Sequence, residues 1–184
     1  MEKQFLSELI VGERISLKRH TVDLAQKMFD YVVEDRERLA QFLPWPKFIN
    51  TVQDEIDFIR KCGSDWDDFI GSYYGIYRNS DDEYMGNISS FSHNWNHHNC
   101  EIGYWILGKF EGQGYMSDAV KLMEKTLFEV GFNRIVIRFD THNAKSGSIP
   151  KRLSYTYEGT LRKVMRVNNV FRDLEVYSKL HSES

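Results

Sequence analysis

The chain has 184 residues, of which 41% are hydrophobic and 28% charged, and its formal net charge is -3. This length suits one domain with a sizeable core, so we expect a single domain that spans residues 1–184. The small negative charge gives no strong basic field of the kind that binds nucleic acid directly. No apolar run approaches the ~20 residues of a membrane span, so a membrane partner is not expected either.

The only two cysteines, Cys62 and Cys100, lie far apart and form no CxxC motif. This usage fits a reducing compartment and argues against a disulfide scaffold. The N-terminal segment carries acidic residues and no signal-peptide core. We therefore expect a cytoplasmic protein.

In the first half of the chain, alternating patterns predict strands at 14–18, 73–77 and 85–91, and helical patterns predict two helices between the first two strands. Thr21 is the expected N-cap of the first helix. Thr51 and Asp54 form a capping-box pattern before the second helix. The prolines of LPWP at 43–46 predict a loop between the helices, and the polar residues 79–82 predict a hairpin turn.

In the second half, strands are predicted at 101–107, 134–139, 155–161 and 171–180, with a short helix after Asn143. A longer amphipathic helix lies between the first two of these strands and should end near Gly131. Its apolar face is formed by Met116, Ala119, Val120, Met123, Leu127 and Val130. The central strand-helix-strand crossover makes strands 101–107 and 134–139 parallel, while the hairpins make other neighbours antiparallel. A mixed sheet with helices on its faces follows.

The segment EIGYWILGKFEGQGYMSDAV at 101–120 is the most informative part of the chain. A strand runs into a loop with three glycines and then directly into a helix. The first N–H groups of a helix lack intrahelical partners and lie at its positive end, and glycines let that backbone approach a phosphate closely. The segment predicts a phosphate cradle, although many such turns contain glycine for backbone reasons alone.

The segment HNAKSGSIPKRLSYTYEG at 142–159 makes the pattern specific when it is combined with EIGYW at 101–105, GYM at 114–116 and the LPWP loop. Together these motifs resemble the GNAT superfamily of N-acetyltransferases, and within it the RimL-like ribosomal-protein-serine acetyltransferases. The resemblance covers almost the whole chain. The residues that match the RimL-like pattern near its end are Asn143, Ser146, Ile149, Pro150, Arg152, Leu153, Glu158 and Gly159.

The resemblance implies an α/β (α+β) fold of one GNAT domain, with a mixed central sheet flanked by helices. Its fourth strand would be bulged and would splay from the fifth to form a coenzyme A groove. The resemblance also implies acetyl-coenzyme A as cosubstrate and no metal. The residues expected to bind the pyrophosphate are Gln113, Gly114, Tyr115, Met116 and Ser117, and the backbone of Ile106 and Leu107 would pair with the pantetheine arm. Glu111 stands where Gln or Arg is usual, and we expect its side chain to point into solvent.

Transfer to an amine requires a proton acceptor for the amine and help for the departing thiolate. The resemblance assigns thiolate protonation to Ser146, because Pro150 stands where many members carry a tyrosine. Asn143 would contact the coenzyme or act only as an N-cap. The usual glutamate is replaced by Met165. Glu101 is the remaining candidate for the base, acting through water, although a glutamate at a strand end is more often a solvated surface charge.

We expect direct attack on the thioester by the α-amine of a protein N-terminus. Two alternatives stay open: a small amine such as a polyamine or an antibiotic as acceptor, or a coenzyme A-binding protein with weakened catalysis. The second is kept open by Pro150, Met165, and Ser154 in place of the usual glycine. Homodimers formed through the last strands are common in the family, but nothing in residues 170–184 requires one.

Three further groups of residues have a structural reading beside a functional one. Trp45, Trp66 and Trp95 would line an acceptor groove or belong to the core. The loop at 91–100 contains three histidines and a cysteine, but their spacing fits no common zinc pattern, so a polar turn is expected. The acidic residues of 65–68 and 81–83 are expected to be solvated.

Overall fold

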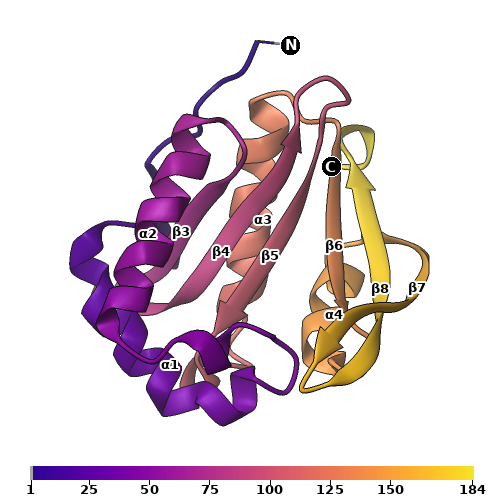
Figure 1. The fold of residues 1–184 in the computed structure, drawn as a ribbon. Helices are drawn as coiled ribbons and strands as arrows, with labels where there is room; N and C mark the ends of the chain where they lie inside the picture. Colours follow the sequence, from indigo (N-terminus) through magenta and orange to yellow (C-terminus); the bar gives the residue numbers. More distant parts are fainter. Residues whose placement is uncertain (1) are drawn as a thin grey trace.

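The computed structural model describes residues 2–184, which form one eight-stranded sheet with helices on both of its faces (Figure 1). The strands are β1 (Leu9–Val11), β2 (Ile15–Arg19), β3 (Ser72–Arg78), β4 (Glu83–Asn94), β5 (Asn99–Ile106), β6 (Arg134–Asp140), β7 (Thr156–Val167) and β8 (Val170–Leu180). The helices are α1 (Ala25–Leu39), α2 (Val52–Asp67), α3 (Tyr115–Glu129) and α4 (Ala144–Arg152). In the sheet the strands follow the order β1-β2-β3-β4-β5-β6-β8-β7.

The sheet is mixed, as the sequence predicts. β5 and β6 are parallel because α3 connects them as a crossover, while the other neighbouring strands are antiparallel. Helices α1 and α2 cover one face, and α3 covers the opposite face (Figure 1). The element missing from the predicted order is β1, a strand of three residues that pairs with β2 at the edge.

The sheet divides between β5 and β6. Only residues Asn99–Ile102 of β5 pair with β6, and their partners are Arg134–Ile137. Beyond these residues β5 stays paired with β4, and β6 stays paired with β8. The two strands therefore diverge toward their C-terminal ends, as Figure 1 shows. The predicted splay is confirmed.

The resemblance indicates a bulge in the fourth predicted strand, 101–107, which corresponds to β5 in this structure. The bulges lie instead on β4. β4 carries both register shifts of this region, one at Met85 opposite β3 and one between Phe91 and Asn94 opposite β5. Residues 101–106 of β5 run in continuous register with β4. The expectation of a bulge within 101–107 was wrong, because the extra residues belong to the preceding strand of the hairpin.

A local signal sets the start of α2. Thr51 and Asp54 form the predicted capping box at α2. Thr21 was wrongly expected to cap α1: its side chain makes no capping bond, and a 3-10 turn, Val22–Leu24, comes first. Helix α4 lies close to β6 because Gly147 has no side chain, since a Cβ there would lie 2.5 Å from the Phe139 ring.

The core lies between the sheet and its helices. Its largest fully buried side chains are Tyr74, Tyr84, Phe132, Ile15, Leu17, Met28, Ile76, Met85, Ile88, Ile102, Leu107 and Met123. The β7–β8 hairpin extends from this core, and at its tip Asn168 donates to the Ala40 carbonyl, 3.0 Å away, just after α1. None of the helices formed by residues 2–184 combines the length and apolar character that crossing a membrane demands.

Candidate functional site

The loop before α3 presents a row of unpaired amides. Gly114 precedes the helix with φ of 84°, and a Cβ there would lie 3.0 Å from the Arg14 guanidinium. Among residues 2–184, no protein group accepts a hydrogen bond from the N–H groups of 113–117. The unpaired N–H groups and the positive end of α3 therefore make this loop suited to an anion.

Side chains hold this loop from both sides. Arg14 donates to Asp118 of α3 across 2.8 Å and to the Gln113 carbonyl across 3.2 Å. Gln113 itself donates to the Lys109 carbonyl across 3.0 Å, so its side chain folds back onto the loop. On the α4 side, the buried Ser117 hydroxyl accepts from Arg152 across 2.9 Å. The cradle is thus shaped before any ligand arrives.

The free edge of β5 is formed by alternate residues. The Leu107 N–H donates to the Met85 carbonyl across 3.0 Å, so Leu107 faces β4. Because backbone groups alternate along a strand, the N–H and carbonyl groups of Tyr104 and Ile106 face the gap toward β6. Of the two residues expected at the pantetheine arm, Ile106 therefore turns toward the gap. The Leu107 amide is already bonded within the sheet, and Tyr104 takes its place at this edge.

On the far side of the gap, α4 presents Ser146 in its first turn. Asn143 is the N-cap of this helix, and its side chain accepts from the Ser146 N–H across 3.1 Å. The Tyr104 phenol donates to the Ser146 carbonyl across 3.1 Å. Ser146 is half-buried, and its hydroxyl makes no hydrogen bond with any of residues 2–184. That hydroxyl is free to donate to a ligand atom near the gap.

Glu101 and Ser146 belong to opposite faces of the sheet. Trp105 packs on Trp45 of the α1–α2 connection, with ring centroids 5.8 Å apart, so Trp105 lies on the α1–α2 face. Glu101 shares that face, because it is four residues away on the same strand. Tyr104 points to the other face, toward Ser146. A nucleophile could thus approach from the Glu101 side while a leaving group departs on the Ser146 side.

The Glu101 carboxylate is only 15% exposed and pairs with Arg138 of β6, 2.6 Å away. It lies where β5 and β6 are still paired, at the closed end of the splay. It is therefore no freely solvated surface charge.

The tryptophans divide between groove and core. Trp45 is half-buried and contacts Trp105, which in turn packs edge-on against Tyr84 at 6.4 Å. This row of rings borders the α1–α2 face of the open strand edge. Trp66 and Trp95 are buried, so they belong to the core.

Glu111 does not point freely into solvent, so that expectation was wrong. Its carboxylate accepts from Arg38 of α1 across 2.6 Å and from Lys145 of α4. Its side chain is only 22% exposed. Arg38 also donates to the Ile106 carbonyl across 2.6 Å. The residue that replaces the usual Gln or Arg thus connects the loop to helices on both sides of it.

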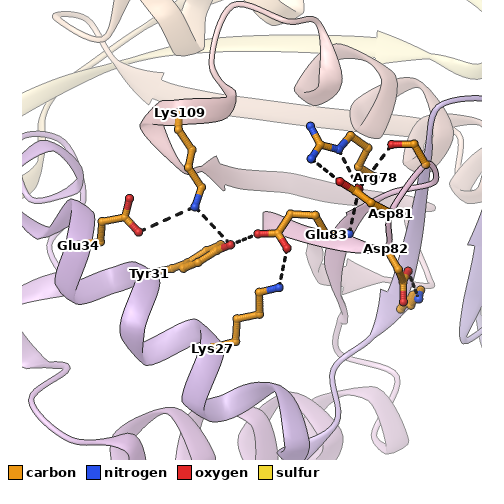
Figure 2. Close-up of polar contacts among 10 residues, drawn as sticks. Lys27, Tyr31, Glu34, Arg78, Asp81, Asp82, Glu83 and Lys109 are labelled. Carbon is orange, nitrogen blue, oxygen red and sulfur yellow. Dashed lines mark hydrogen bonds and ion pairs between the residues drawn. The ribbon is translucent and has the colours of Figure 1, made fainter.

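A second polar group ties α1 to the start of β4 and to Lys109, which lies in the loop before α3. Figure 2 shows Glu83 between Lys27, 2.8 Å away, and the Tyr31 hydroxyl. Hydrogen bonds from Lys27 and Tyr31 lower the pKa of Glu83, while burial and the bond to Glu83 raise the pKa of Tyr31. Lys109 lies 4.5 Å above the Tyr31 ring. The loop before α3 is therefore held to α1 by Lys109 as well as by the ion pair of Glu111 with Arg38.

Two acidic residues that were expected to be solvated are structural. Glu83 belongs to the group in Figure 2, and Asp65 is buried with Lys61 and the Tyr73 hydroxyl as partners. The histidine-rich loop forms the β4–β5 hairpin turn. Burial lowers the pKa of His93 to about 4. Residues 2–184 contain no group of three His, Cys, Asp or Glu side chains that could hold a metal ion.

The roles of Arg38, Tyr104 and Lys145 are not evident from the sequence. Arg38 lies in the last turn of α1, 73 positions before Glu111, and no local pattern links the two. In the sequence, Tyr104 stands out only as part of the EIGYW motif. The one available signal was Glu111 itself, because a carboxylate beside an anion cradle needs a cation as partner.

Comparisons with known proteins agree with this geometry. Residues 14–156 match the family described as "Acetyltransferase (GNAT) domain". The chain is 29% identical over 177 residues to "Putative ribosomal N-acetyltransferase YdaF" of Bacillus subtilis (strain 168), covering 94% of each chain. It is 23% identical to the "Ribosomal-protein-serine acetyltransferase" of Escherichia coli (strain K12), covering 92% of this chain and 94% of that one.

A similar fold is found in the structure "RimL- Ribosomal L7/L12 alpha-N-protein acetyltransferase in complex with Coenzyme A". The TM-score is 0.89 at 22% identity, over 94% of this chain and 98% of that chain. The family match includes β5, the loop before α3 and the whole of α4. This chain belongs to the acetyltransferase (GNAT) family.

Proposed function

We propose that this N-acetyltransferase acetylates the α-amine of a protein N-terminus, with Ser146 and Glu101 on opposite sides of the reacting centre. Membership of the family makes the chain an acetyltransferase that uses acetyl-coenzyme A. The amides of 113–117 suit its pyrophosphate, and the edge of β5 at Tyr104 and Ile106 suits an extended amide-bearing arm. Asn143 lies at the start of the helix that carries Ser146, and its side-chain oxygen caps that helix.

The observation that supports the proposal is that Glu101, at the closed end of the splay, and Ser146, beside the open edge of β5, belong to opposite faces of the sheet. Glu101 is ion-paired and enclosed on the α1–α2 face, and Ser146 has a free hydroxyl on the α4 side. The acceptor amine would lose its proton to Glu101 through water, and Ser146 would donate to the departing sulfur. Because a thiol has a pKa near ~8.5, a weak donor is sufficient for that second step.

A peptide acceptor is supported by the shape of the α1–α2 face. Asn168 joins the β7–β8 tip to Ala40, so the approach to the gap passes between that hairpin and the row formed by Trp45, Trp105 and Tyr84. An approach bordered by aromatic rings suits an extended chain end. The relatives named for ribosomal-protein serine and for "[Ribosomal protein uS5]-alanine" point to small N-terminal residues.

The test is acetyl transfer to peptides that begin with serine or alanine, compared with the same peptides carrying a blocked N-terminus and one internal lysine. We expect turnover only with the free α-amine. Turnover of a polyamine with no turnover of either peptide would replace the proposed acceptor with a small amine. Binding of coenzyme A without turnover of any amine would favour a binding protein.

Three further expectations remain part of this proposal. A homodimer through the last strands is supported by exposed apolar side chains on the β7–β8 hairpin, namely Tyr157, Leu161, Val164, Val170 and Phe171. Residues 1–184 would act as one domain. A cytoplasmic location is supported by the two cysteines, which are both free thiols.

A further inference from the structure

Four charged side chains meet beside the anion cradle, and none of them was assigned a role by the proposed chemistry. They are Asp35 and Arg38 of α1, Glu111 of the loop before α3, and Lys145 of α4. We call them the Glu111 cluster. Arg38 donates to Asp35 across 2.9 Å and to Glu111 across 2.6 Å, and Lys145 also pairs with Glu111. The cluster joins three elements that come from distant parts of the chain.

The cluster lies at the open end of the splay. Arg38 donates to the Ile106 carbonyl across 2.6 Å, and Asp35 accepts from the Gly108 N–H across 2.9 Å. The Ile106 carbonyl faces the gap, on the strand edge where an extended ligand would pair. Glu111 is three residues before Gly114, in the same loop as the unpaired amides of 113–117. A ligand that pairs with the strand edge at Ile106 and also binds the amides of 113–117 would therefore pass close to Arg38 and Glu111.

The charges in the cluster are placed as they would be around a bound anion. Glu111 accepts from two cations at once, on two different oxygens. Its side chain is 22% exposed, and those of Arg38 and Lys145 are 32% and 76% exposed. A carboxylate near the positive end of α3 is itself stabilised there. Yet the same positive end and the same two cations would stabilise a phosphate more strongly, because a diphosphate carries more charge and more acceptor oxygens.

We propose that Glu111 is an internal anion that competes with the diphosphate of coenzyme A for Arg38 and Lys145. When the donor binds, both cations exchange the carboxylate for phosphate oxygens, and Arg38 also releases the Ile106 carbonyl. The inference rests on the proposed function, because it assumes that the cradle receives a coenzyme diphosphate. It assigns Arg38 and Lys145 as diphosphate ligands and Glu111 as the residue that sets their affinity.

This exchange has a thermodynamic consequence. Part of the attraction between the diphosphate and the two cations is offset by the ion pairs that must break. Removal of the Glu111 charge takes away that competition and also the repulsion between the carboxylate and the incoming phosphates. The Glu111→Gln variant should therefore bind coenzyme A more tightly, although it loses two ion pairs of the free protein.

The experiment is titration calorimetry of the full chain with coenzyme A at low and moderate salt. We expect Glu111→Gln to lower the dissociation constant about five- to tenfold, since each exchanged ion pair is modest at a solvent-accessible site. Glu129→Gln is the matched control, because it removes the same charge from the last turn of α3, and we expect its affinity to be unchanged. Pantetheine, which lacks the diphosphate, should not distinguish Glu111→Gln from the natural chain.

A double-mutant cycle tests the exchange itself. In the natural chain, Lys145→Met removes a phosphate contact. It also removes the Lys145–Glu111 ion pair, which would otherwise have to break when coenzyme A binds. Because the two effects offset each other, we expect the dissociation constant to change less than about twofold. In the Glu111→Gln background there is no ion pair to break, so only the phosphate contact is lost. Lys145→Met should then weaken binding about fivefold. Equal effects in the two backgrounds would overturn the proposed competition.

The outcomes separate the inference from the proposed function. If the natural chain binds coenzyme A but Glu111→Gln binds it equally or more weakly, Glu111 is a structural link between loop and helices, and the inference fails alone. If neither protein binds coenzyme A, the cradle assignment fails, and the inference fails with it.

Discussion

The Tyr104 phenol donates a hydrogen bond to the Ser146 carbonyl across 3.1 Å, and so joins the open half of β5 to the first turn of α4. The two residues lie on opposite sides of the gap between β5 and β6. Burial raises the pKa of Tyr104 to about 12, so the phenol is a neutral donor at physiological pH. One side chain thus bridges the gap and fixes the helix that carries the proposed sulfur-side donor.

Replacement of Tyr104 by phenylalanine removes this bridge and leaves the ring in place. We expect the free energy of unfolding to fall by about 1 kcal/mol, the usual contribution of one hydrogen bond. We also expect kcat to fall several-fold, because Ser146 is then less firmly placed. Tyr73→Phe is the control, since its hydroxyl bonds to Asp65 away from the gap. Denaturant unfolding and steady-state kinetics on both variants would separate the two effects, and equal kcat losses would contradict a positioning role.

Ser146→Ala tests the proposed donor to sulfur. The hydroxyl makes no hydrogen bond with any of residues 2–184, so its loss should leave stability unchanged within about 0.5 kcal/mol. We expect kcat to drop about 10- to 100-fold, toward the low end of general-acid effects because thiolate is a fair leaving group. Ser148→Ala, two residues along the same helix, should retain full activity. An unchanged kcat in Ser146→Ala would remove Ser146 from the chemistry.

Glu101→Gln tests the proposed base. Loss of the carboxylate should lower kcat/KM about 100-fold. Arg138→Gln is the informative partner variant, because it breaks the same ion pair but keeps the carboxylate. We expect Arg138→Gln to retain most of the activity. Equal losses in the two variants would show that the ion pair matters only for structure.

Ser154→Gly should stabilise the protein. Ser154 follows α4 with φ of 61°, in the left-handed region, where it completes a C-terminal cap in which the Tyr155 N–H donates to the Pro150 carbonyl across 2.9 Å. Glycine relieves the Cβ strain of about 1–2 kcal/mol, and its own chain entropy offsets part of the gain. We expect a net gain of about 0.5–1 kcal/mol in urea unfolding. Ser154→Ala keeps the Cβ and should show no gain.

Glu55 makes stability depend on pH. It is 2% exposed, and its Oε1 has no hydrogen-bond partner among residues 2–184. Burial, with a smaller effect of Asp54, raises its pKa from 4.5 to about 7. The folded protein therefore holds a proton that the unfolded chain releases above about pH 4.5. Stability should fall as pH rises from 4.5 to 7 and then level off.

Glu55→Gln removes this dependence. We expect it to be more stable than the natural chain by about 1–3 kcal/mol at pH 8 and nearly equal to it at pH 4.5. Asp57→Asn, on the exposed side of the same helix, should behave like the natural chain at both values. The measurement is thermal and urea unfolding across this range. A constant difference between Glu55→Gln and the natural chain at all pH values would contradict burial of a titrating carboxylate.

The sequence predicts most of the fold because local patterns and chain order determine it. The crossover through α3 requires β5 and β6 to be parallel, and the Thr51 capping box marks the start of α2. The three-residue strand β1 carries too few positions to show a periodic pattern. The position of the bulges at Met85 and after Phe91 depends on how two strands fit together, which no single strand encodes.

The candidate site was predictable in part for the same reason. The free amides of 113–117 follow from a local strand-loop-helix pattern, and Ser146 follows from a motif in the resemblance. The partners of Glu111 do not, because Arg38 and Lys145 reach it only after α1 and α4 have packed on opposite sides of the loop. Tyr104 was missed since its role depends on which strand edge stays unpaired.

The two buried cysteines make the chain unusually convenient for a direct assay. Cys62 and Cys100 are 4% and 3% exposed, and burial raises the pKa of Cys62 to about 12. Thiol reagents react with accessible thiolate, so the folded protein should contribute almost no signal of its own. Each acetyl transfer releases one free coenzyme thiol. Turnover can therefore be followed colorimetrically in real time against many acceptors, and a rise in background thiol would report unfolding in the same cuvette.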